Sequence, residues 1–149
     1  MTASVVALAP LARDAPGGPT APVASRRPPR VTKPSALTTH VLNTAEGVPA
    51  EGVPVELWRM DGEGGGPALV ARAVTNADGR TDAPLLAPEA FAPGRYELRF
   101  GVGAYFAARG ADAGYLGVVA VGVGLRAGEG HYHVPLLCSP WSYATYRGS

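Results

Sequence analysis

Three histidines are the residues of this chain best suited to chemistry, and two of them lie close together. His131 and His133 are two positions apart in a stretch with β-strand character, so both rings project from one face of the strand. His40 is far away in the sequence. An imidazole has an unperturbed pKa of about 6.5 and exchanges protons at neutral pH. The three histidines are therefore candidates for one shared site.

Three interpretations of these histidines are open from the residues alone. Three imidazoles and a water can form a hydrolytic zinc centre. The same residues can act as general acid and base without a metal, or they can be ordinary surface or core histidines. The single cysteine, Cys138, excludes an internal disulfide, makes a cysteine-built zinc site implausible and is compatible with a reducing cytosol.

Arg80 and the C-terminus supply further polar candidates. Arg80 ends the turn formed by residues 75–80, and the simplest role for a lone arginine there is a surface ion pair with Asp78. The last four residues carry an aromatic ring, a guanidinium and the terminal carboxylate, whereas most termini are small, polar and mobile. This ending predicts a tail that docks on the protein. These residues are Tyr146, Arg147, Gly148 and Ser149.

Short β-strands must position these candidates. Residues 53–57 and 95–100 alternate between apolar and polar side chains, as half-buried strands do. Residues 103–110 predict one short helix closed by Gly110, and residues 131–139 are interpreted as the last strand. Seven or so strands with almost no helix predict an all-β fold, a two-sheet β-sandwich with one short helix.

Composition and charge limit the other classes of function. Residues 1–33 are rich in Pro, Ala, Gly and Arg and predict a disordered arm, which leaves residues 34–149 as one folded domain. Thirteen basic and twelve acidic residues nearly cancel, so no nucleic-acid partner is expected. No apolar run approaches the roughly 20 residues that span a bilayer. We expect a soluble, cytoplasmic protein that takes a small ligand.

Three blocks of sequence carry a resemblance to a known family. They are Leu-Thr-Thr-His-Val-Leu-Asn-Thr at 37–44 with Gly-Val-Pro-Ala at 47–50, Thr-Asn-Ala-Asp-Gly-Arg at 75–80, and His-Tyr-His-Val-Pro-Leu-Leu at 131–137 running to Tyr-Arg-Gly-Ser at 146–149. Residues 35–149 resemble the 5-hydroxyisourate hydrolases, also called transthyretin-like proteins. The block at 75–80 is weak alone, because unrelated sandwich modules share such turns; the histidine blocks and the tail supply the specificity.

The resemblance implies residue roles. His40, Arg80 and His133 match catalytic positions, with the split of base and acid between the histidines unresolved. Residues 146–149 and His131 match substrate-binding positions, and the tail is expected to fold inward and to bury the ring of Tyr146. The implied reaction converts 5-hydroxyisourate to 2-oxo-4-hydroxy-4-carboxy-5-ureidoimidazoline in urate degradation, with no cofactor and no metal.

The resemblance also implies a transthyretin-like (prealbumin-like) sandwich and a homotetramer built as a dimer of dimers. Two departures from the family pattern concern Asn43, where many members have Asp, and the glycine-rich residues 117–130. One alternative is a non-catalytic transthyretin-like protein that binds a small ligand, although transthyretins proper lack these histidines and the terminal tetrapeptide. A second alternative is a β-sandwich module of a larger secreted protein, which the missing signal peptide and companion domain disfavour.

Overall fold

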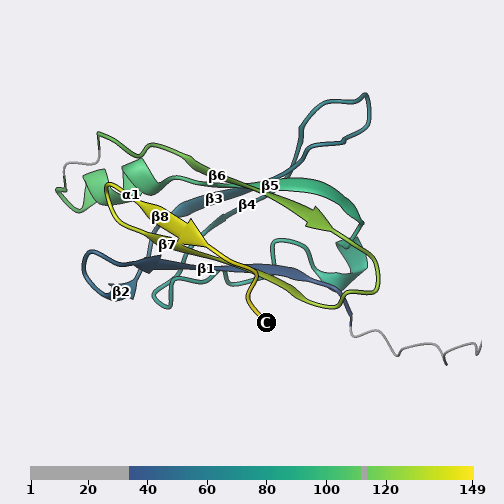
Figure 1. Ribbon diagram of the computed structural model, residues 1–149, viewed down its shortest axis with the longest axis horizontal. Coiled ribbons are helices and arrows are strands. Elements are labelled where there is room, and N and C mark those ends of the chain that lie inside the picture. Colours follow the sequence, from purple (N-terminus) through teal and green to yellow (C-terminus); the bar gives the residue numbers. More distant parts are fainter. Residues whose placement is uncertain (1–33, 112–113) are drawn as a thin grey trace, which may run out of the picture. The chain divides into compact units, whose positions relative to one another are not determined.

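The protein is described by a computed structural model over residues 34–111 and 114–149. The predicted arm, residues 1–33, lies outside the described residues. The described residues fold around two four-stranded sheets (Figure 1), as the alternating sequence pattern predicts. No helix among the described residues is long and apolar enough to cross a membrane.

The first sheet has the strand order β2-β1-β7-β8 and joins segments that are far apart in the sequence. It consists of β1 (Leu37–Asn43), β2 (Val48–Pro49), β7 (Tyr132–Cys138) and β8 (Tyr143–Thr145). β1 and β7 run parallel, with Leu37 opposite Tyr132 and His40 opposite Pro135, and the other pairs are antiparallel. This parallel pair brings two of the three sequence blocks side by side.

The second sheet has the strand order β4-β3-β5-β6 and is antiparallel throughout. Its strands are β3 (Pro54–Arg59), β4 (Ala68–Val74), β5 (Gly94–Phe100) and β6 (Val119–Leu125). β3 and β4 form a hairpin around the glycine-rich residues 61–66, and β5 buries one face, as the alternation at residues 95–100 predicts.

The hydrophobic core uses the inward faces of both sheets. Inward residues on β1, β3, β5 and β7 are fully buried, and they include Leu37, Val41, Leu57, Leu98, Phe100 and Leu136. On β1 buried positions alternate with half-buried ones along the whole strand. Burial of one face fixes the register of β1, because a slip by one residue would turn every side chain to the other face. The outward face of β1 is thereby defined as well.

Two short helices complete the fold: a 3-10 turn, η1 (Pro88–Ala90), and α1 (Val102–Ala108). α1 is the predicted helix, and Gly110 follows it with a φ of +75°, a conformation that glycine adopts without strain. The side-chain amide of buried Asn43 donates to the Tyr105 hydroxyl at 3.1 Å. This bond connects α1 to the end of β1.

The expectation that residues 131–139 form the last strand is wrong. β7 ends at Cys138, and β8 follows and pairs with it antiparallel. Ser139 closes the turn between them, because its amide donates to the Ser142 carbonyl at 2.9 Å and its hydroxyl accepts from the Ser142 amide at 3.1 Å. Pro140 has no amide hydrogen to continue the ladder. β8 then returns along β7, and beyond it Gly148 forms an antiparallel bridge with His133.

Candidate active site

β1 presents His40 on its outward face, and residues 75–80 hold Arg80 beside it. His40 and Arg80 form an isolated antiparallel bridge on the edge of β1 away from β7. The Val41 amide donates to the Gly79 carbonyl at 2.8 Å. A Cβ on Gly79 would lie 2.3 Å from the Val41 carbonyl oxygen, and the φ of Gly79 is +71°. Only glycine allows this close approach of the turn to the strand.

The turn itself is organised by Asn76. Its side-chain oxygen accepts from the backbone amide of Asp78 at 3.0 Å and from that of Arg80 at 3.2 Å. The backbone amide of Asn76 donates to the Arg80 carbonyl at 2.8 Å. An Asn side chain that bonds the backbone two residues on stabilises such a turn. The side-chain amide of Asn76 also donates to the Asp82 carboxylate at 2.8 Å. The backbone of Arg80 is therefore fixed next to His40.

β7 adds the second catalytic candidate from the other side of β1. His133 lies opposite Thr38 in the parallel register, so it is on the same outward face as His40. Thr38 Oγ1 lies 2.8 Å from Nε2 of His131 and 2.9 Å from Nδ1 of His133. The two imidazole rings stack with centroids 6.5 Å apart. The predicted projection of both rings from one face is confirmed.

The C-terminal tail reaches the same place. The Gly148 amide donates to the His133 carbonyl at 2.8 Å, and the two residues form an isolated antiparallel bridge. A Cβ on Gly148 would lie 2.6 Å from Cδ2 of the His133 ring. Upstream, the Thr145 hydroxyl donates to the Pro135 carbonyl at 2.7 Å. Gly148 therefore lies directly against the edge of the His133 ring.

Two bridged pairs thus lie near each other on the sheet: Arg80 bridges His40 on β1, and Gly148 bridges His133 on β7. His133 is opposite Thr38, so it is offset by two positions along the strands from Pro135, the residue opposite His40. The three sequence blocks thus converge. No ion pair joins Arg80 to Asp78, the pairing that a surface role would predict, and the guanidinium has no ion pair with any residue that the structure describes.

Burial and charge lower the pKa of both site histidines. Burial lowers the pKa of His40 and the positive charge of Arg80 lowers it further, against the opposing effect of a hydrogen bond with the Asp78 backbone. Burial also lowers the pKa of His133, followed by the charges of Arg80, His131 and His40. Nε2 of His40 is buried and has no hydrogen-bond partner among the described residues. Such an atom can accept a proton or a hydrogen bond from a reacting molecule.

Arg147 and Tyr146 make contacts away from the histidines. The Arg147 guanidinium donates to Glu129 at 3.1 Å and lies 4.5 Å from the centre of the Tyr132 ring. The expectation that Tyr146 buries its ring is not met, because Tyr146 is 60% exposed. Tyr146 and Arg147 line a cavity of about 330 Å³ between β6 and the inward side of β7. Ser149 is exposed.

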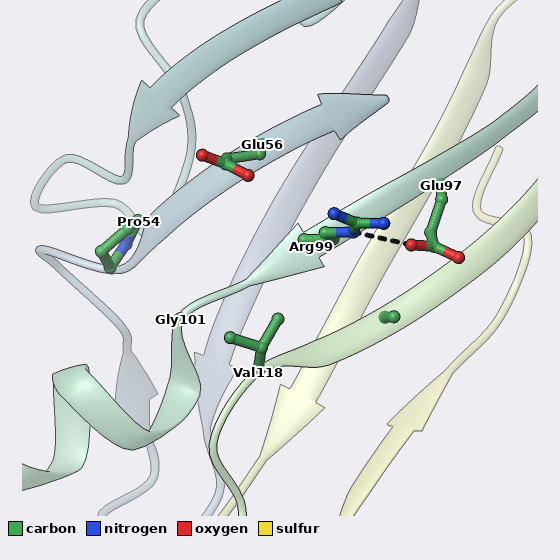
Figure 2. Close-up of a pocket in the computed structure, with 7 residues that line it drawn as sticks. Pro54, Glu56, Glu97, Arg99, Gly101 and Val118 are labelled. Carbon is green, nitrogen blue, oxygen red and sulfur yellow. Dashed lines mark hydrogen bonds and ion pairs between the residues drawn. The ribbon is translucent and has the colours of Figure 1, made fainter. Parts of the chain in front are cut away.

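Another hollow, of about 660 Å³, lies on the second sheet and contains none of the predicted site residues. Figure 2 shows that its charged side chains come from neighbouring strands and that Arg99 is paired with Glu97. The Arg99 guanidinium also lies 4.6 Å from the centre of the Trp58 ring. Glu56 is paired with Arg72 at 3.0 Å, so each charged side chain of the hollow has a partner. Among the described residues, no group of three or more His, Cys, Asp or Glu side chains is placed to hold a metal ion.

The sequence pattern of one protein family spans this whole arrangement and matches residues 37–148. The chain belongs to the HIUase/Transthyretin family. A 5-hydroxyisourate hydrolase of Halalkalibacterium halodurans is 54% identical over 116 residues, which cover 76% of this chain and 97% of the relative. The family resemblance and the transthyretin-like fold expected from the sequence are therefore confirmed.

Solved structures place the chain within the same family. The crystal structure of (S)-allantoin synthase is 41% identical with a TM-score of 0.71; the match covers 78% of this chain but only 44% of that chain. Sea bream transthyretin in complex with thyroxine is 28% identical with a TM-score of 0.69, over 77% of this chain and 94% of that one. The much higher identity to the hydrolase favours the catalytic reading over the ligand-binding alternative.

Two residues that contact the histidines or the C-terminal tail were not identified from the sequence. Thr38 touches both histidines of β7, and Glu129 holds Arg147. Thr38 lies two positions before His40, so the period of a strand could have placed it on the same face. Glu129 carries no such signal, because its partner comes from a tail whose path depends on β8.

Proposed function

We propose that this chain hydrolyses 5-hydroxyisourate to 2-oxo-4-hydroxy-4-carboxy-5-ureidoimidazoline, a reaction of urate degradation. The observation that carries the proposal is that the Arg80–His40 bridge and the His133–Gly148 bridge lie two positions apart on the paired strands β1 and β7, with both histidines on the outward face. The relatives named as 5-hydroxyisourate hydrolases support the reaction. The proposed catalytic residues are His40, Arg80 and His133.

The two histidines would transfer the protons. Hydrolysis opens a cyclic C–N bond: a water loses a proton, its oxygen adds to the carbonyl carbon, and the ring nitrogen takes up a proton as it leaves. A neutral imidazole is needed to accept the first proton, and the lowered pKa values of His40 and His133 keep both rings neutral at pH 7. A placed base of this kind contributes roughly 100- to 10,000-fold.

Arg80 would act on the oxygen of the carbonyl. When water adds, that oxygen becomes negatively charged, and an oriented positive donor nearby stabilises it. The charge of Arg80 acts on both histidines, and the guanidinium is not committed to an ion pair with a described residue. It is therefore available to bind the substrate, and its planar fork suits the edge of a purine-like ring.

Substrate binding is proposed for the tail and for His131. Gly148 limits the space beside His133, while Tyr146, Arg147 and Ser149 continue the same segment. Because Tyr146 and Arg147 face a separate cavity in the single chain, their contact with substrate would require a rearranged tail or the surface of a neighbouring subunit.

A homotetramer in the cytoplasm completes the proposal. β8 is an edge strand of its sheet, and Trp141, Tyr143 and Tyr146 are 59%, 49% and 60% exposed around it. Unpaired strand edges and exposed aromatic rings are suited to self-association. The buried free thiol of Cys138, whose pKa burial raises to about 11, fits a reducing compartment.

A direct assay tests the activity. Purified protein is mixed with freshly generated 5-hydroxyisourate, and the ultraviolet absorbance is followed against the spontaneous decay. The proposal expects a decay that is faster in proportion to protein concentration. An unchanged decay rate with folded protein would contradict it.

A further inference from the structure

A threonine hydroxyl lies between two imidazole rings at the edge of the proposed site. Thr38 Oγ1 is 2.8 Å from Nε2 of His131 and 2.9 Å from Nδ1 of His133. Thr38 projects from the outward face of β1 and lies opposite His133 in the parallel register of β1 and β7. These contacts hold the ring of His133 by its Nδ1 atom. Its Nε2 atom is then the one left to meet a reacting molecule.

The number of protons restricts how these three groups can bond. A hydroxyl has one proton to donate, while a neutral imidazole has one nitrogen that donates and one that accepts. Among the described residues, the two ring nitrogens are the only hydrogen-bond partners of Thr38 Oγ1. The hydroxyl therefore donates to one ring and accepts from the other. The tautomers of His131 and His133 are coupled through Thr38.

We propose that Thr38 is a positioning residue for the hydrolysis, which keeps His133 in the tautomer with its proton on Nδ1 and connects it to His131. This proposal rests on the proposed function. Nδ1–H of His133 donates to Thr38, and the Thr38 hydroxyl donates to Nε2 of His131. Nε2 of His133 then carries the lone pair that accepts the proton of the attacking water.

The arrangement also gives the positive charge an exit, while the accepted proton stays on Nε2 of His133 until the leaving ring nitrogen takes it up and the transfers through Thr38 run in reverse. When Nε2 of His133 takes a proton, the proton on its Nδ1 can pass to Thr38 Oγ1 while the Thr38 proton passes to Nε2 of His131. His131, which is exposed, then releases its own Nδ1 proton to solvent. The bonds that break and form balance at each oxygen and nitrogen. The positive charge leaves His133, where the charges of Arg80 and His40 oppose it, and reaches the more solvated ring.

The test replaces the hydroxyl alone. Thr38→Val has the shape of threonine without its hydrogen bonds, and Thr38→Ser restores the hydroxyl. Thr44→Val is the matched control, because the Thr44 hydroxyl donates to the Cys138 carbonyl at 3.1 Å across the same strand pair, away from the histidines. We expect T38V to lower kcat by about tenfold or more with KM changed by less than about threefold. The kcat of T38S and of T44V should stay within about threefold of the wild-type kcat.

A second measurement does not depend on turnover. The ¹⁵N chemical shifts of the imidazole nitrogens report the tautomer, and wild type should show His133 protonated on Nδ1, with a mixture of tautomers in T38V. Wild-type kcat in T38V, or a His133 tautomer that T38V leaves unchanged, would overturn the proposal. So would a wild-type His133 protonated on Nε2. If wild type lacks hydrolysis altogether, the proposed function fails, whereas the ¹⁵N result still decides whether Thr38 couples the two rings.

Discussion

The backbone of Gly148 is hydrogen-bonded to that of His133, and its Cα lies against the edge of the imidazole ring. The N–H···O distance is 2.8 Å, and a Cβ on Gly148 would lie 2.6 Å from Cδ2, 3.2 Å from Cβ and 3.2 Å from Cγ of His133. Real contacts of a Cβ atom are not as short as the first of these. The ring and the tail can therefore keep their relative position only if residue 148 is glycine.

Gly148→Ala is expected to move either the tail or the His133 ring. Because a misplacement of about 1 Å at a reacting group can cost on the order of 100-fold in rate, kcat should fall by about tenfold or more. The free energy of unfolding should change by less than about 1 kcal/mol, since Gly148 lies at the chain end outside the core. Steady-state kinetics and denaturant unfolding check both parts. Wild-type kcat in G148A would show that this contact is not used.

Truncation after Thr145 removes the tail but leaves β8 complete, because β8 ends at that residue. The sandwich should stay folded, while turnover drops by about tenfold or more, which corresponds to about 1.4 kcal/mol of transition-state stabilisation. Circular dichroism and the decay of 5-hydroxyisourate measure the two effects. Glu129→Gln keeps the tail but weakens its ion pair with Arg147 at 3.1 Å, so its turnover should lie between those of wild type and the truncated chain. Full turnover by the folded truncated protein would remove the tail from the mechanism.

The pH dependence follows from the two site histidines. Burial first, and the charge of Arg80 second, hold the pKa of His40 and of His133 below the ordinary value of 6.5. A base must be unprotonated to act, so kcat/KM should be level from neutral pH down to about 6.5 and fall only below it. The free energy of unfolding should change in the same direction. The contribution of the two histidines is fully present above about pH 6.5 and decreases as the pH falls toward their lowered pKa values in the folded protein, because the unfolded chain then binds more protons.

Arg80→Gln should raise the pKa of both histidines, because one of the two main causes of the lowering is removed. The titration of their ring protons by NMR measures this directly and needs no turnover. Arg72→Gln is the matched control, since Arg72 pairs with Glu56 on the second sheet at 3.0 Å. Unchanged histidine pKa values in R80Q, or the same rise in R72Q, would contradict this account of the electrostatics.

Catalysis is predicted to proceed without a bound metal. The positive charge of Arg80 acts on both His40 and His133, and it would repel a cation placed between the rings. Protein dialysed against a strong chelator should therefore keep its full turnover. Zinc present at one equivalent per chain, with activity lost on chelation and restored by zinc, would show the opposite.

The sequence predicted the strands and their faces where one side is buried. The alternation at residues 95–100 and 53–57 reflects a solvent face and a core face, and β5 and β3 have those faces. The turn at residues 75–80 was also predictable. The Asn76 side chain can bond the backbone that follows it, and Gly79 can adopt a positive φ. The convergence of the three blocks was expected only from the family resemblance.

Contacts that depend on register and chain path could not be predicted. Thr38 meets His131 and His133 because β1 and β7 pair in parallel across 93 and 95 residues of sequence, and no local pattern encodes that register. β8 was missed because it has only three residues and all three are exposed. Without β8 the path of the tail was unknown, so neither the pair of Arg147 with Glu129 nor the exposed ring of Tyr146 could be anticipated.

The most direct test of the central claim compares wild type with His40→Asn and His133→Asn in the 5-hydroxyisourate assay. Wild-type protein is predicted to accelerate the loss of absorbance well beyond the spontaneous rate. Each variant should lose about 100-fold or more of that acceleration while keeping the circular dichroism spectrum of wild type. Decay at the spontaneous rate with folded wild-type protein, or wild-type rates in both histidine variants, would contradict the assignment of hydrolysis to this group of residues.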